Sequence, residues 1–158
     1  MNSRRWMLPL VSGVGAVLSA CGTVHYGISA LTPAEVNTQA VAYNHARVQI
    51  RGYVMIGTDT NLIYQSRALH EKFSREYRST SYNDRARLER LRKEAKNYCI
   101  RIENPSTIRD YLKPYKPPQV MMTLTLSGVL LTDPLPPDII PLGGCDNDSR
   151  LVVDHVSH

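Results

Sequence analysis

Two segments of this chain share the pattern apolar-x-apolar-x-Gly-x-apolar, and they constrain the fold more than any other feature. The pattern occurs as VQIRGYV at residues 48–54 and again as LTLSGVL at residues 124–130. Alternating apolar side chains predict strands with one face in a core, because successive residues of a strand point to opposite sides. A glycine inside a strand normally weakens it, so Gly52 and Gly128 indicate bends or bulges in a strongly curved sheet.

Three further segments have strand character. LIYQS at residues 62–66 follows the turn-forming stretch GTDTN and predicts the return strand of a hairpin. YCIRIE at 98–103 and RLVVDHV at 150–156 complete a set of five strands. Five strands with two glycine kinks predict a small closed or partly closed barrel, with a β-sandwich as the alternative.

These strand segments resemble those of OB-fold domains in small bacterial lipoproteins and periplasmic proteins. The resemblance covers residues 46–156 and rests on VQIRGYV, YCIRI, LTLSGVL and LVVDHV. It implies a mainly β fold with helices (α+β), built on an OB-like, five-stranded curved barrel. Typical OB-folds carry their helix between the third and fourth strands, whereas the helices expected here lie between the second and third.

The first predicted helix lies before the strands, in the segment LTPAEVNTQAVAYNHA. Thr32 has the place of an N-cap, Pro33 that of the first helical residue, and Glu35 follows the cap by three residues. Val36, Ala40 and Tyr43 then share one face. This pattern predicts a helix about three turns long.

A helical insert is predicted at residues 67–97. Apolar residues recur there at helical spacing, which indicates two helices joined by a polar turn; they are Leu69, Phe73 and Tyr77, then Leu88, Leu91, Ala95 and Tyr98. The second helix carries six cations against three anions. Such a face is either simply solvated, with i,i+4 ion pairs, or a basic docking surface. Arg87, Arg90 and Lys93 are the docking candidates, because they lie off the apolar stripe.

A second candidate binding surface is the outward face of the first strand. Arg51 and Tyr53 alternate with the apolar positions and are expected to be exposed side by side. An aromatic residue beside an arginine can form a binding platform, and it can equally be an ordinary surface feature.

The N-terminal segment has the features of a secretory signal. Arg4 and Arg5 precede an uncharged run at residues 6–20, which is too short for a membrane-spanning helix. The sequence Leu18-Ser19-Ala20-Cys21 resembles the lipobox of Gram-negative bacterial lipoproteins, in which the chain is cleaved before the cysteine and the thiol is acylated with chains such as palmitate. The resemblance implies membrane attachment through Cys21. Gly22, a residue other than Asp, implies an outer-membrane location facing the periplasm.

This assignment divides the chain into a signal peptide at 1–20, a lipid-anchored tether at 21–31 and a single OB-like domain at 32–158. Loss of Arg4 and Arg5 lowers the formal net charge from +5 to +3, so the basicity does not argue for a nucleic-acid partner. Cys99 and Cys145 then remain in a compartment where disulfides persist. They form either one bridge or two separate buried thiols.

Standard catalytic signatures are missing from the sequence. It contains no GxSxG, HExxH, P-loop or paired CxxC motif, so no catalytic residue, metal site or cofactor is predicted. The expected function is that of a non-enzymatic binding or structural module with a protein or anionic envelope partner. An immunity or inhibitor lipoprotein acting against a secreted or periplasmic toxic enzyme is the alternative.

Overall fold

The computed structural model describes residues 29–58, 60–113, 119–134, 145 and 147–158. The predicted signal peptide and Cys21 lie outside the described residues. The elements in chain order are α1 (Pro33–Thr38), η1 (Ala40–Tyr43), β1 (Arg47–Ile56), β2 (Asn61–Tyr64), α2 (Arg67–Ser79), α3 (Arg85–Ala95), η2 (Lys96–Tyr98), β3 (Cys99–Ile102), α4 (Pro105–Tyr111), β4 (Val120–Leu131) and β5 (Arg150–Ser157).

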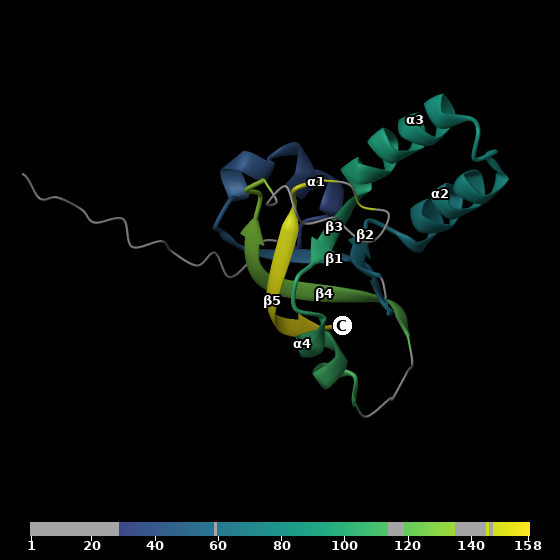
Figure 1. Cartoon of the computed structure of the whole chain (residues 1–158). Helices are drawn as coiled ribbons and strands as arrows, with labels where there is room; N and C mark the ends of the chain where they lie inside the picture. Colours follow the sequence, from purple (N-terminus) through teal and green to yellow (C-terminus); the bar gives the residue numbers. More distant parts are fainter. Residues whose placement is uncertain (1–28, 59, 114–118, 135–144, 146) are drawn as a thin grey trace, which may run out of the picture.

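The five strands form a closed barrel in the order β1-β2-β3-β5-β4, with β4 returning to β1 (Figure 1). β1 and β4 pair antiparallel from Arg47↔Val129 to Ile56↔Val120, along the whole of β1. β3 and β5 pair parallel, and the other neighbours pair antiparallel. The closed barrel confirms the OB-like α+β prediction and excludes the β-sandwich.

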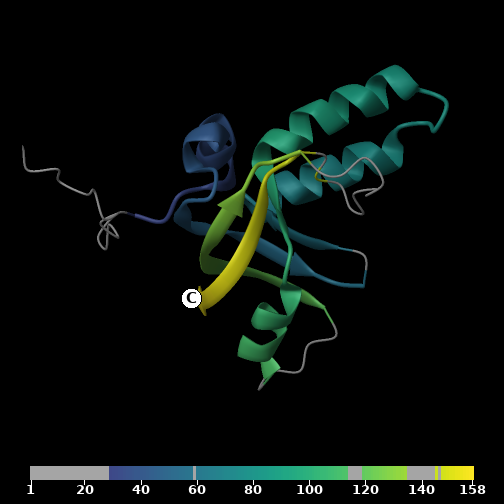
Figure 2. The same cartoon turned by 60° about the vertical axis from the view of Figure 1, so that its left-hand side comes forward.

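A short helix, α4, occupies the connection between the third and fourth strands. Pro105 stands in its first turn, where a missing backbone N–H costs nothing. Asn104 ties this end to β5, since its side chain donates to Val153 O at 2.6 Å and accepts from Val153 N at 2.7 Å. The expected departure from OB topology is therefore wrong in part: the typical helix is present, and the helical insert is additional (Figure 2).

The first helix is shorter than its sequence pattern predicts. The capping box is formed, because Thr32 Oγ1 accepts from Glu35 N while a Glu35 carboxylate oxygen accepts from Thr32 N at 2.7 Å. The backbone leaves the helical region at Gln39 (φ −122°, ψ 29°) and continues as η1. Of the predicted face only Val36 is buried, and Ala40 and Tyr43 are half-buried.

Apolar side chains are buried in two separate clusters. The first fills the barrel and includes Ile50, Val54, Leu124 and Leu126. The second lies outside the barrel, between the helical insert and the outer face of β1, β2 and β3. Its buried members are Tyr53, Leu62, Tyr64, Phe73, Leu91, Ala95, Cys99 and Cys145. The insert therefore packs on the outside of the barrel through this second apolar cluster, which is called here the seat of the insert.

A disulfide joins Cys99 to Cys145, which confirms one of the two alternatives for these cysteines. Their Cα atoms are 5.8 Å apart, within the usual range for a bridge. The bond links the first residue of β3 to the segment that precedes β5. Both sulfur atoms belong to the second apolar cluster, so the bridge also stabilises the seat of the insert.

The two strand glycines are places of close backbone approach. A Cβ atom on Gly52 would lie 2.7 Å from Ile63 Cγ1 and still closer to the Tyr64 carbonyl oxygen. At Gly128 it would lie 2.8 Å from the Val152 carbonyl carbon, and the β4–β5 register shifts between Ser127 and Gly128. The bulge predicted at Gly128 is confirmed, and at Gly52 the constraint is the contact with β2.

We expect Gly52→Ala and Gly128→Ala each to lower the free energy of unfolding by about 1–3 kcal/mol, as overpacking against rigid neighbours does. Chemical denaturation followed by circular dichroism measures the change. Gly57→Ala is the matched control, because a Cβ atom there would meet only Thr60 O, at 3.9 Å. Stabilities of the first two variants equal to that of the control would contradict the close-approach argument.

Candidate functional site

The most distinctive surface of the molecule is the helical insert, defined here as the helical hairpin, residues 67–96. Its two helices lie side by side and project from the barrel (Figures 1 and 2). Ser66 caps α2 by accepting from Leu69 N at 3.2 Å, and Asp84 caps α3 by accepting from Arg87 N at 3.0 Å. Each helix thus begins at a capping side chain. The turn between the two helices lies at the end of the hairpin that is farthest from the barrel (Figures 1 and 2).

The formal charge is divided unevenly between the hairpin and the barrel. The hairpin carries ten Lys and Arg against five Asp and Glu, a formal charge of +5. The rest of residues 21–158 carries seven Lys and Arg against nine Asp and Glu, a formal charge of −2. All the net positive charge of the domain is therefore concentrated on the projecting hairpin.

Three ion pairs neutralise part of the hairpin. Arg67 Nε lies 2.7 Å from a Glu71 carboxylate oxygen, and this hydrogen bond holds the pKa of the Glu71 carboxyl below its usual range. Lys72 Nζ lies 2.9 Å from Glu94 and joins α2 to α3, which raises the pKa of the lysine. The third pair, Lys93 with Glu89, is looser at 3.8 Å.

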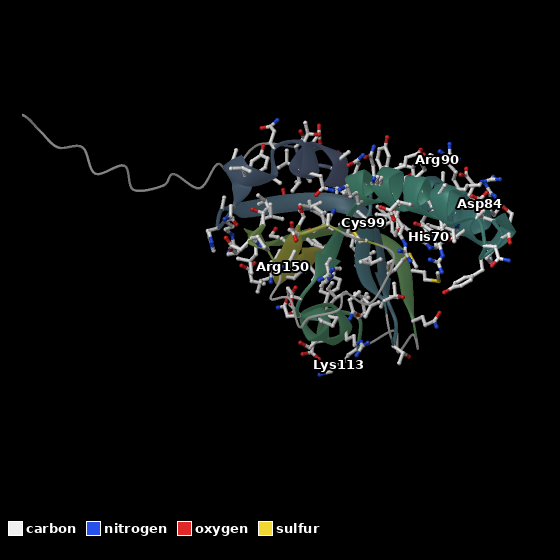
Figure 3. All side chains as sticks on the ribbon, turned by 45° about the horizontal axis from the view of Figure 1, so that its top comes forward. His70, Asp84, Arg90, Cys99, Lys113 and Arg150 are labelled. Atoms are coloured by element: carbon white, nitrogen blue, oxygen red, sulfur yellow. A yellow bond between two sulfur atoms is a disulfide. The ribbon has the colours of Figure 1, made fainter. Side chains whose placement is uncertain are left out.

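The other hairpin cations have no ion-pair partner among the described residues. Arg78 Nε donates only to the backbone oxygen of Ser74, at 3.1 Å. Every one of these side chains is exposed; they are Arg75, Arg78, Arg85, Arg87, Arg90, Arg92 and Lys96. Figure 3 shows Arg90 on the outer side of α3 and Asp84 at its beginning.

Two of the three predicted docking residues belong to these exposed cations without an ion-pair partner, and the third does not. Arg87 and Arg90 are exposed and without an ionic partner in the described part of the chain, whereas Lys93 is engaged by Glu89. Sequence reasoning on α3 alone missed Arg75 and Arg78, which α2 contributes. The packing of α2 against α3, which adds these two arginines to the same surface, is a tertiary contact that the sequence pattern of one helix does not contain.

The second predicted surface, at Arg51 and Tyr53, is not formed. Arg51 is exposed and donates to Thr125 Oγ1 at 3.1 Å. Tyr53 does point outward from β1, but the hairpin covers it and leaves it only 7% exposed. The prediction that Tyr53 is exposed is therefore wrong, because alternation gives the face of a strand and not what packs on that face.

His70 is a half-buried polar residue of α2 beside two tyrosines of the barrel wall. Its ring lies 5.2 Å from the Tyr64 ring and 6.0 Å from the Tyr53 ring, and its Nε2 is 3.0 Å from Ser74 Oγ. Burial is the largest influence on His70 and lowers its pKa; Glu71 nearby opposes this shift, and Arg78, the smallest of the three influences, lowers the pKa further. Burial together with the neighbouring Tyr77 phenol raises the pKa of Tyr64 to about 12.

The described residues show no grouping of His, Cys, Asp and Glu side chains suited to a metal ion. Asp154 is paired with Arg47 across the barrel rather than with its neighbour His155. Within the described part of the chain, no helix is long and apolar enough to cross a bilayer. No family model, curated protein or solved structure matches this chain.

His70 makes the seat of the hairpin sensitive to pH. Its pKa is lowered in the folded chain relative to the ordinary value of 6.5, so the unfolded chain binds the proton more readily. The stability contributed by the neutral ring is complete above pH 6.5 and is lost as the pH falls below that value toward the folded-state pKa. His70→Gln should remove this loss.

Urea denaturation at several pH values between 7.5 and 5 checks the effect. His155→Gln is the control, since His155 is exposed on β5 and should leave the pH profile of the wild type unchanged. A wild-type profile that coincides with that of His70→Gln would show that this ring does not limit stability in acid.

Proposed function

We propose that this protein is a lipid-anchored lipoprotein of the bacterial envelope, attached through acyl chains on Cys21 and located at the outer membrane facing the periplasm. It acts as a non-enzymatic binding module whose contact surface is the helical hairpin. The observation that carries the proposal is the set of exposed hairpin cations without ion-pair partners among the described residues, on a domain that is otherwise net acidic. Such a surface fits an anionic partner.

The packing of the hairpin supports a binding role. Phe73 is 1% exposed and Leu91 5% exposed in the second apolar cluster, so the hairpin is fixed to the barrel and not a loose extension. The Cys99–Cys145 bridge lies at its base. A firmly seated hairpin presents its cations in a constant arrangement, and this lowers the entropy lost when a partner binds.

Lipidation is tested by metabolic labelling with an alkynyl fatty acid. We expect the wild type to carry the label and Cys21→Ser to lack it, because only the thiol following Leu18-Ser19-Ala20 is in a lipobox. Cys145→Ser, which removes a cysteine that lies in the folded domain, should keep the label. Label on the Cys21→Ser chain would overturn the anchor assignment.

The binding surface is tested by replacing Arg87, Arg90 and Lys93 together with Glu. A chain of residues 22–158 contains every described element and lacks the acylated cysteine, so its sedimentation with washed envelope membranes reports the surface alone. We expect the wild type to sediment at low salt and to be released as ionic strength rises, and the variant to bind several-fold more weakly. Circular dichroism verifies folding.

The matched control places the same charge reversal on the barrel, at Arg51, Arg109 and Lys113, which are all exposed. This second triple variant should bind as the wild type does. If the two triple variants and the wild type sediment equally at every salt concentration, the hairpin is a solvated face and the proposed binding role is wrong.

A further inference from the structure

We infer that the hairpin docks on the phosphate surface of an anionic phospholipid bilayer, with Tyr82 at the level of the headgroups. The inference rests on the proposed function and identifies the partner of the same surface. The turn between the helices, residues 80–84, is the leading part of the contact. It is flanked by Arg78, Arg85 and Arg87, which are exposed and have no ion-pair partner among the described residues.

The distribution of the cations favours an extended charged surface over a single ligand. They come from both helices and reach from Arg75 and Arg78 on α2 to Lys96 at the end of α3. All seven are exposed. Basic residues spread in this way gain about fivefold in binding for each one near an anionic membrane surface, the equivalent of about 1 kcal/mol.

Tyr82 is the second observation that points to a bilayer. Its side chain is 86% exposed at the turn. Among the described residues the other exposed large apolar side chains lie outside the hairpin; they are Val41, Tyr111 and Met121. Tyrosine is enriched at the interface between membrane and water, because its ring is apolar and its hydroxyl forms hydrogen bonds with water. A folded protein partner would require a cluster of apolar contacts at the centre of the interface, and the hairpin offers a single ring.

The position of the tether places the hairpin within reach of the membrane that holds Cys21. Leu31 is fixed to β1, since its N–H donates to Gln49 O and its carbonyl accepts from Arg51 N, both at 2.8 Å. The ten residues from Cys21 to Leu31 span at most about 33–36 Å, and the 13-residue helix α2 is about 20 Å long.

The helix that follows the tether, α1, contacts the base of the hairpin. The Asn37 amide of α1 donates to Lys96 O and Asn97 O, both at 3.1 Å, where the hairpin returns to the barrel. A fully extended tether is thus longer than α2, and the first helix after it is joined to the base of the hairpin.

A fluorescent reporter at the tip tests the contact. The one tryptophan of the chain, Trp6, lies in the predicted signal peptide, so the mature lipoprotein with Tyr82→Trp has a single tryptophan at the tip. This lipoprotein is reconstituted into vesicles of phosphatidylcholine alone or mixed with phosphatidylglycerol. Both sets contain phosphatidylcholine with a nitroxide on its headgroup, which quenches a tryptophan at the level of the headgroups.

We expect quenching and a blue-shifted emission in the phosphatidylglycerol vesicles only, lost at about 1 M salt, where the Debye length is about 3 Å. Reversal of Arg78, Arg85 and Arg87 to Glu should weaken the docked state by about 100-fold or more, at fivefold for each cation. Reversal of Arg51, Arg109 and Lys113 on the barrel should leave the signal unchanged. The melting temperature of each variant verifies that it is folded.

Emission that is the same in both vesicle types, or unaffected by the hairpin reversal, would overturn the bilayer inference. If envelope sedimentation still depends on Arg87, Arg90 and Lys93 in that case, the binding role stands and the partner is an acidic protein. If neither measurement responds, both proposals are wrong. A mass that retains residues 1–20 would refute the anchor itself, independently of the tip signal.

Discussion

The rest of the structure depends on β1, which is buried on one face along its first half and on both faces along its second. Residues 47–51 alternate between exposed and buried positions, and from Gly52 onward the outward side chains are covered as well. Gly52 is the point of change, because its lack of a side chain lets β2 approach and begin pairing at Tyr53↔Tyr64. The same strand closes the barrel with β4 and carries the hairpin on its other side.

The strands and their inward faces could be predicted from the sequence, because a period of two is a local property. Val48, Ile50, Val54 and Ile56 all lie in the barrel cluster, as the alternation requires. The outward half of β1 could not be predicted in the same way. Whether Tyr53 meets water or a helix depends on where the hairpin folds back, and this is decided by contacts with Phe73 and Leu91 far along the chain.

The short helix α4 shows a different limit. Its sequence contains Pro105 and leads into a proline-rich stretch, which by composition indicates either a loop or a short turn of helix. The helix forms because its proline is in the first turn and because Ile108 and Leu112 bury their side chains at the end of the barrel. The candidate surface shows the same limit. Arg87 and Arg90 could be predicted because they lie off the apolar stripe of one helix. The contact of His70 with two strand tyrosines depends on how the helix packs on the assembled barrel.

The hairpin stays folded despite its excess of positive charge, because its stability comes from the apolar face that packs on the barrel. Seven exposed cations without ionic partners in the described structure repel one another, yet exposed charge interactions contribute only about 0–1 kcal/mol each. Burial of one large apolar side chain contributes about 1.5–3 kcal/mol, and Phe73 and Leu91 are both buried beneath the helices. Burial of these two side chains is therefore of the same order as the repulsion on the outer face, and it offsets that repulsion. A proton on His70 would place a charge against the apolar side chains that hold the hairpin to the barrel, and burial is accordingly the largest cause of the lowered pKa of His70, ahead of the opposing effect of Glu71 and the smaller lowering effect of Arg78.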